Sequence, residues 1–200
     1  ANIEVAGSVN SDTAFIGATK LSWNKWNYDF QVLAGKYYED YVVGFGWAGG
    51  IKKWGFKGES SYFIDSQDID KTVVSLSVSG EYILPKNKFL GIGILYSSNG
   101  VTRNTDISSS FLTFQTSAKS LMPTSWSAMT SFVGELNGIT SYALILVYMP
   151  GVDFAVFMPS ITRSVAQNFD LSFHMINIGG RLNNQNTFLA NGFVRAKWSF

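Results

Sequence analysis

Residues 194–200, at the end of the chain, alternate strictly between two kinds of side chain. One set is apolar and the other polar, namely Val194, Ala196, Trp198 and Phe200 against Arg195, Lys197 and Ser199. A period of two is the side-chain period of a β-strand. The segment therefore predicts a terminal strand with one apolar and one polar face.

The same alternation recurs along the whole chain. It is clearest in residues 72–84, where Val74 and Val78 alternate with Ser75 and Ser77, and it returns in residues 26–38 and 54–64. Residues typical of turns separate the windows. These breaks fall at 10–12, 24–25, 39–40, 52–53, 65–70, 85–87, 137–138, 150–151, 164–168 and 181–186. No linker interrupts the series, so residues 1–200 are predicted to form a single domain.

The number of windows gives the predicted architecture. Counting residues 111–121 as a strand gives an odd total, whereas treating residues 98–125 as one long outer loop gives roughly twelve strands, as an even-stranded barrel requires. We therefore predict an all-β fold, a transmembrane antiparallel up-and-down β-barrel of about 12 strands, with about 14 as the alternative. The breaks at 24–25, 52–53, 85–87 and 137–138 become periplasmic turns. The longer connections at 65–70, 98–125 and 181–186 become outer loops.

Composition favours a membrane location for this barrel. Charged residues make up only 14% of the chain and aromatic residues 16%, against roughly 25% charged residues in soluble domains. No run approaches the roughly 18 apolar residues of a membrane helix, which excludes a helical membrane protein. A start at Ala1 fits either a mature form whose leader was removed or the C-terminal part of a longer protein.

A soluble β-barrel or sandwich is the alternative, because each alternating window also fits a soluble core. The aromatic residues favour the membrane, since they lie toward window ends, as interfacial girdles do. They are Trp23, Trp26, Tyr41, Trp47, Trp54, Tyr62, Tyr82, Tyr96, Trp126, Tyr142, Tyr148 and Trp198.

The whole chain resembles a Gram-negative outer-membrane porin-like β-barrel protein. The resemblance rests on the terminal Phe200, on Arg195 and Lys197, and on repeated hairpins such as residues 141–163. It implies a bacterial outer-membrane location and passive transport of small solutes, or a closed barrel with another task. It also implies contact with outer-membrane lipid and lipopolysaccharide, and recognition of Phe200 by the barrel-assembly machinery. The net charge of +1 argues against a nucleic-acid partner.

Three patterns that resemble active or cofactor sites are interpreted as structural. Residues 44–49 spell a dinucleotide fingerprint, but a turn and a strand follow in place of the required helix. His174 is the only histidine, and Asp170, Ser172 and His174 would lie roughly 7 Å apart along one strand face, too far for a catalytic triad. We therefore expect no catalytic residue, no cofactor and no enzymatic activity.

Charged loop residues are interpreted as solvated. Asp65, Asp68 and Asp70 lack the glycine and distal glutamate of a calcium loop, so no metal site is expected. The pairs at 39–40 and 52–53 are interpreted as ordinary turns.

The functional prediction is a narrow porin-like channel for passive diffusion of small solutes. The alternative is a non-conducting structural or accessory barrel of an envelope complex with protein partners. The residues predicted to face the lumen are Lys20, Asp29, Lys57, Glu59, Glu81, Glu135, Asp170, His174, Arg195 and Lys197. The loop at 98–125 is too apolar to extend into water, so it is predicted to fold into the mouth of the lumen as a constriction. The candidates there are Phe111, Phe114 and Lys119.

Overall fold

The computed structural model describes residues 1–9, 15–102, 115–150, 152–182 and 185–199. They form one sheet of twelve antiparallel strands in chain order, which confirms the predicted all-β, up-and-down fold. The strands are β1 (Asn2–Val9), β2 (Phe15–Lys25), β3 (Tyr28–Tyr37), β4 (Asp40–Ile51), β5 (Trp54–Asp65), β6 (Val73–Leu84), β7 (Lys88–Ser97), β8 (Trp126–Asn137), β9 (Thr140–Met149), β10 (Phe154–Ala166), β11 (Phe169–Leu182) and β12 (Gln185–Trp198). In these ranges the only helix is the short 3-10 turn η1 (Ile69–Lys71), and no helix could cross a bilayer.

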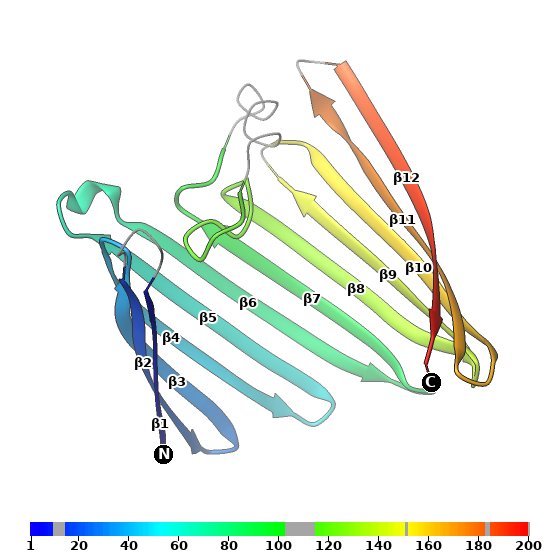
Figure 1. Cartoon of the computed structure of the whole chain (residues 1–200), viewed down its shortest axis with the longest axis horizontal. Helices are drawn as coiled ribbons and strands as arrows, with labels where there is room; N and C mark the ends of the chain where they lie inside the picture. Colours follow the sequence, from blue (N-terminus) through cyan, green and yellow to red (C-terminus); the bar gives the residue numbers. More distant parts are fainter. Residues whose placement is uncertain (10–14, 103–114, 151, 183–184, 200) are drawn as a thin grey trace.

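The connections between strands lie at two opposite ends of the sheet (Figure 1). Short turns join β2 to β3, β4 to β5, β6 to β7, β8 to β9 and β10 to β11 at one end, where both termini also lie; we call it the short-turn end. The opposite end, the loop end, carries η1 and the connection of residues 98–125. This division agrees with the predicted placement of short and long connections, except that β11 and β12 leave only residues 183–184 between them.

One turn lies two residues later than predicted. Asn24 and Lys25 still pair with Asp29 and Tyr28, so β2 continues through the expected break. The reversal occurs at Trp26 and Asn27, which take φ values of 56° and 62°. Two successive residues with positive φ are typical of the tight hairpin turn that matches strand twist.

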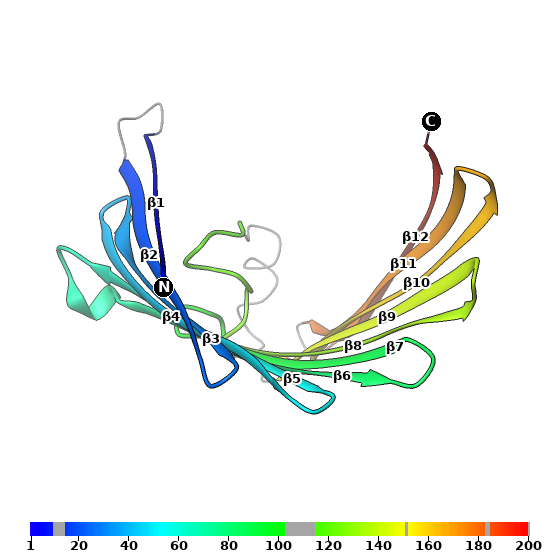
Figure 2. The same cartoon turned by 90° about the horizontal axis from the view of Figure 1, so that it is seen from below.

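The sheet is curved into an open trough (Figure 2). Each strand pairs with its neighbours in sequence, and β1 and β12 form the two rims, with no pairing between them among the described residues. The stems of the connection between β7 and β8 lie on the concave side. Because the strand number is even, β1 and β12 run in opposite directions, as closure of an antiparallel barrel requires.

Strand register determines which side chains face the trough. Asp40 at the start of β4 binds Lys119, which belongs to the connection on the concave side. Alternate residues of a strand share one face; we say that positions on the same face as Asp40 have concave parity and that the others have convex parity. Val42 has the parity of Asp40 and is buried, whereas Tyr41 and Val43 have the other parity and are exposed. Directly opposed residues share a face, so this assignment extends through the registers of all twelve strands.

The convex face is apolar and exposed. On β6 and β7, Val78 and Ile94 keep 54% and 56% of their surface accessible. Soluble monomers rarely expose a continuous apolar surface of this extent. The main buried apolar cluster is small and lies on the concave side at the loop end, where Met149, Val152 and Phe154 contact Val101.

Aromatic side chains form two belts on the convex face. All the aromatic residues singled out in the sequence, except the turn residue Trp26, have the parity of this face. The rings of Trp54 and Tyr82 pack in a tilted arrangement near the short-turn end, with centroids 4.6 Å apart, and those of Tyr96 and Trp126 do so near the loop end, with centroids 4.8 Å apart. Along β5, Trp54 and Tyr62 lie about 27 Å apart at roughly 3.4 Å per residue. With strand tilt, this spacing is close to the apolar band of about 25 Å of membrane barrels.

Candidate functional site

The ten residues predicted to face a lumen all have the parity of the concave face. Glu4 opposes Lys20, Ala48 opposes Lys57, and Gly46 opposes Glu59, so these side chains share one surface. On the other half of the sheet, Asp170 opposes Lys197 and Ser172 opposes Arg195. The concave face is therefore the candidate functional surface.

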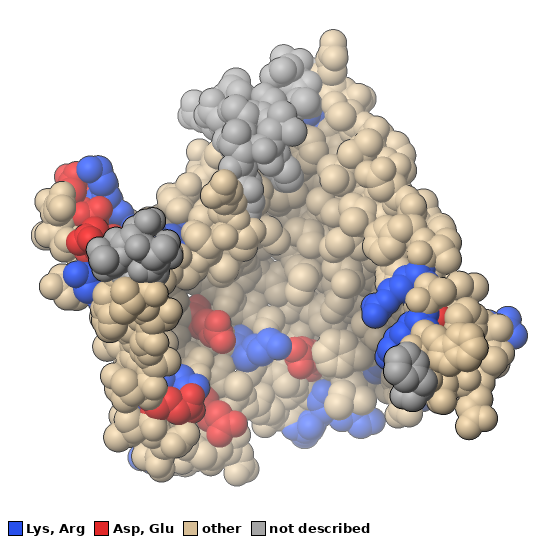
Figure 3. All heavy atoms as spheres, viewed as in Figure 1, with Lys and Arg blue, Asp and Glu red and all other residues tan. Residues whose placement is uncertain are grey.

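Charged residues gather on the concave face toward the short-turn end (Figure 3). On β1 and β2, Lys20 Nζ lies 2.9 Å from Glu4 Oε2. On β5 and β6, Lys57 forms an ion pair with Glu81. Both pairs remain partly exposed, so each contributes little to stability. They do neutralise most of the formal charge along this wall.

Gly46 on β4 leaves room on the charged wall for the side chain of Gln31. A Cβ atom at Gly46 would lie 2.8 Å from Gln31 Nε2, so the amide of Gln31 occupies the space above this glycine. Two depressions of about 160 and 180 Å³ flank Gln31, and Glu59 lines both of them. Among the described residues, Glu59 has no ion-pair partner. Its carboxylate is thus available to a solute or cation in the trough.

The concave face changes character along β9 to β12. At the loop end, Val147 and Met149 of β9 oppose Val156 and Phe154 of β10, which gives an apolar wall. Toward the short-turn end, Thr162 and Ser172 share a hydroxyl contact of 2.9 Å. The charged residue Arg195 lies directly opposite Ser172, and Asp170 and Lys197 lie beyond them. The trough is therefore polar at the short-turn end and partly apolar at the loop end.

The described parts of the connection, residues 98–102 and 115–125, lie at the loop end of the trough. Its Lys119 binds Asp40, whose relative exposure is only 5%, while its Val101 packs against the Met149 cluster.

The interpretation of Asp40 as a solvated turn residue is wrong, because it starts β4 with its side chain on the concave side. In the sequence, Asp40 alternates in phase with Val42, and this alternation indicates that the two side chains share a face. Phe111 and Phe114 lie outside the described residues.

Asp170, Ser172 and His174 are not arranged as a triad. Ser172 contacts Thr162, and the ring of His174 stacks on Phe193 with centroids 5.0 Å apart. These partners belong to the neighbouring strands, so the three residues form a strip along one face of β11.

The glycines of residues 44–49 lie within β4, and a turn and β5 follow. At the loop end, Asp65 accepts hydrogen bonds from the backbone N–H groups of Gln67 and Asp68, and Asp68 accepts one from Asp70. These carboxylates organise the turn around η1. In the described ranges no group of three or more His, Cys, Asp or Glu residues is placed to hold a metal ion.

Comparisons with protein-family models, with curated proteins and with solved structures found no match to this chain.

Proposed function

We propose that the chain forms the wall of a narrow outer-membrane channel for passive diffusion of small polar solutes. The observation that carries this proposal is the opposite polarity of the two faces. The concave face carries the charged and hydroxyl side chains, whereas the convex face is apolar, exposed and bounded by aromatic belts. This is the pattern that lipid outside and water inside require of a membrane barrel.

In a membrane, the free edges of β1 and β12 need partners. Unpaired backbone N–H and C=O groups are not tolerated in lipid, because no water is present to bind them. We propose that the two rims of the trough become paired in the membrane. Recognition of Phe200 by the assembly machinery, which would accompany insertion, remains a prediction, because Phe200 lies outside the described residues.

The concave face supports small polar solutes with weak charge preference. Lys20 and Lys57 are each paired with a glutamate, so Asp29 and Glu59 are the carboxylates toward the short-turn end of this wall that have no ion pair among the described residues. Ion selectivity in a pore depends on rings or clusters of one sign of charge. A wall of mostly paired charges favours general diffusion, and a modest cation preference would arise through Glu59 together with Asp29, which lines the same depression. We propose no enzymatic activity for this surface.

Single-channel recording in a planar bilayer tests the proposal. We expect small, stable conductance steps from the refolded protein, and a reversal potential in a salt gradient that shifts toward anions in Glu59→Lys. Glu59→Gln is the matched control and should produce a smaller shift in the same direction. A well-folded protein that produces no steps would contradict the channel.

The second candidate is a non-conducting accessory barrel of an envelope complex. It is favoured by the connection across the loop end, where Lys119 and Val101 reach Asp40 and the Met149 cluster. A silent protein that co-purifies with specific envelope proteins would support this alternative. A conducting protein without such partners would exclude it.

A further inference from the structure

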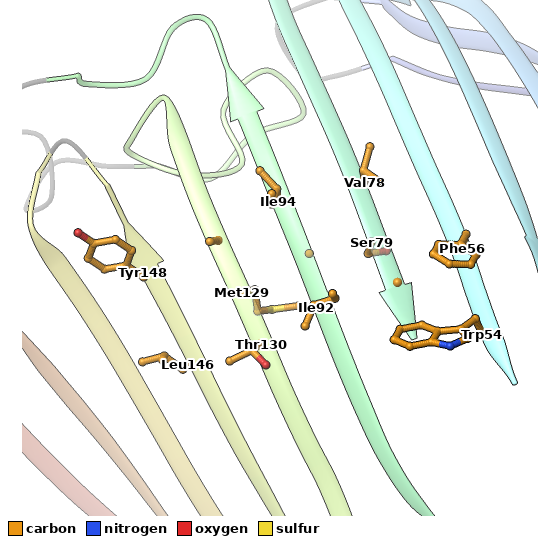
Figure 4. A pocket seen from close by; sticks show the side chains of 13 residues that line it. Trp54, Phe56, Val78, Ser79, Ile92, Ile94, Met129, Thr130, Leu146 and Tyr148 are labelled. Atoms are coloured by element: carbon orange, nitrogen blue, oxygen red, sulfur yellow. The ribbon is translucent and has the colours of Figure 1, made fainter. Parts of the chain in front are cut away.

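The convex face carries a groove between the two aromatic belts (Figure 4). It spans β5 to β9, has a volume of about 460 Å³ and is lined almost entirely by apolar atoms. Small residues at Gly80 and Ala128 leave room between the larger side chains of Phe56, Ile92 and Leu146. A Cβ atom at Gly80 would already lie 3.6 Å from the Phe56 ring and 3.8 Å from Ile92. Larger residues there would fill the groove.

A group of lysines lies at the short-turn end of the same strands. Lys52 and Lys53 form the turn between β4 and β5, while Lys86 and Lys88 lie in and just after the turn between β6 and β7. The two turns are neighbours, because the backbone N–H of Ile83 donates to the carbonyl of Lys53 over 3.3 Å. We call these four residues the lysine cluster.

The lysine cluster adjoins the groove at Trp54. Trp54 lines the groove and directly follows Lys53 in the chain. The aliphatic part of the Lys88 side chain lies on the convex face, where its Cγ atom would be 3.1 Å from a Cβ atom added at Gly134. None of the four lysines forms an ion pair with a described residue. One end of an apolar groove is thus bordered by unneutralised positive charge.

The loop end has a different character. Asp65, Asp68 and Asp70 lie around η1, and within the described part of the chain Lys71 is the one cation that pairs with any of them, at 3.3 Å from Asp68. Acidic and basic residues are mixed at that end, where Lys71 and Lys36 lie near the carboxylates, so an anionic headgroup would be attracted more strongly to the lysine cluster. The charges therefore distinguish the two leaflets of a membrane that the sheet would span.

From this arrangement we propose a binding site for an anionic phospholipid on the convex face. An acyl chain occupies the groove, and the phosphate of the headgroup contacts the lysine cluster at the short-turn end. Compact ammonium groups bind phosphates as point charges, and clusters of lysines near a membrane surface attract anionic lipids. The inference rests on the proposed membrane location, and it is independent of whether the trough conducts.

Native mass spectrometry of the full chain, extracted from vesicles of mixed phosphatidylglycerol and phosphatidylcholine, tests the site. We expect the protein to retain phosphatidylglycerol preferentially. Replacing all four lysines by glutamine should reduce this retention at least about tenfold. Lys25→Gln is the matched control, because Lys25 lies at the same end of the sheet but outside the cluster and instead covers the ring of Trp26. It should leave retention nearly unchanged.

A second variant tests the groove separately. Ala128→Phe adds an apolar ring at the groove floor, so it should lower retention of both lipids. As the control for folding, the variant should still migrate faster on a denaturing gel when unheated than when boiled. Equal retention of the two lipids by the unmodified protein, or full retention by the four-lysine variant, would refute the site. Folding without detergent as a water-soluble monomer would instead refute the membrane location itself.

Discussion

At the scale of single residues, the two faces of each strand have distinct chemistry. On β6, Ser77 lies on the concave face opposite Glu59, and the next residue, Val78, lies on the exposed convex face. The same substitution at these two neighbouring positions therefore meets two environments. The pair gives a direct test of which face contacts lipid.

Val78→Arg is predicted to impair folding into membranes, whereas Ser77→Arg is tolerated. An arginine facing lipid near the middle of a barrel wall costs about 2–4 kcal/mol. At Ser77 the guanidinium would instead lie beside the free carboxylate of Glu59. The measurement is the folded fraction in lipid vesicles, read from migration of unheated samples on a denaturing gel. Equal folded fractions for the two variants would mean that the convex face does not contact lipid.

At the scale of elements, the connection between β7 and β8 is the part of the chain that departs from a simple meander. Its two stems are joined by backbone hydrogen bonds, from Val101 N–H to the carbonyl of Pro123 and from Ser125 N–H to the carbonyl of Val101. Asn99 also donates to the carbonyl of Lys119 over 3.2 Å. The base of this connection is therefore ordered by its own contacts, separately from the ladder of the sheet.

Excision of residues 104–119, with a short Gly/Ser bridge, is predicted to leave the sheet folded and to raise channel conductance. The stems around Val101 and Thr124 would remain, while the contact of Lys119 with Asp40 across the loop end would be lost. Lys119→Ala is the smaller control and should raise conductance less. Unchanged conductance in a well-folded deletion variant would show that this connection does not constrict the path.

At the scale of the whole molecule, the decisive property is the pair of free rims. Edge strands with unpaired backbone groups promote association with other strands. In β1 and β12 every residue with a described side chain is exposed. Pairing of these two strands is the simplest way to complete the sheet, because it joins antiparallel neighbours and leaves no edge.

Closure within one molecule is predicted to be detectable by disulfide formation in membranes. The chain contains no cysteine, so introduced pairs give an unambiguous signal. Ala6→Cys on β1 would be combined in turn with Leu189→Cys, Asn191→Cys and Phe193→Cys on β12, all of concave parity. We expect one combination to cross-link within a monomer. Cross-linked dimers alone would show that the rims pair between molecules.

The sequence by itself determined the strands and their two faces. Alternation is a local property with a period of two, so it identified β6 within a residue and placed Lys57, Glu59 and Glu81 on one surface. Turn chemistry likewise separated most of the short connections from the long ones. These features depend only on neighbours in the chain.

The tertiary structure decided what depends on distant contacts. The burial of Asp40 follows from Lys119, which lies far along the chain, and the apolar patch around Met149 requires β9 and β10 to meet Val101. The groove and the lysine cluster arise only when five strands are set side by side. Curvature, and with it the separation of the two rims, results from the twist accumulated over the whole sheet. The sequence of a single strand therefore does not determine the curvature of the sheet.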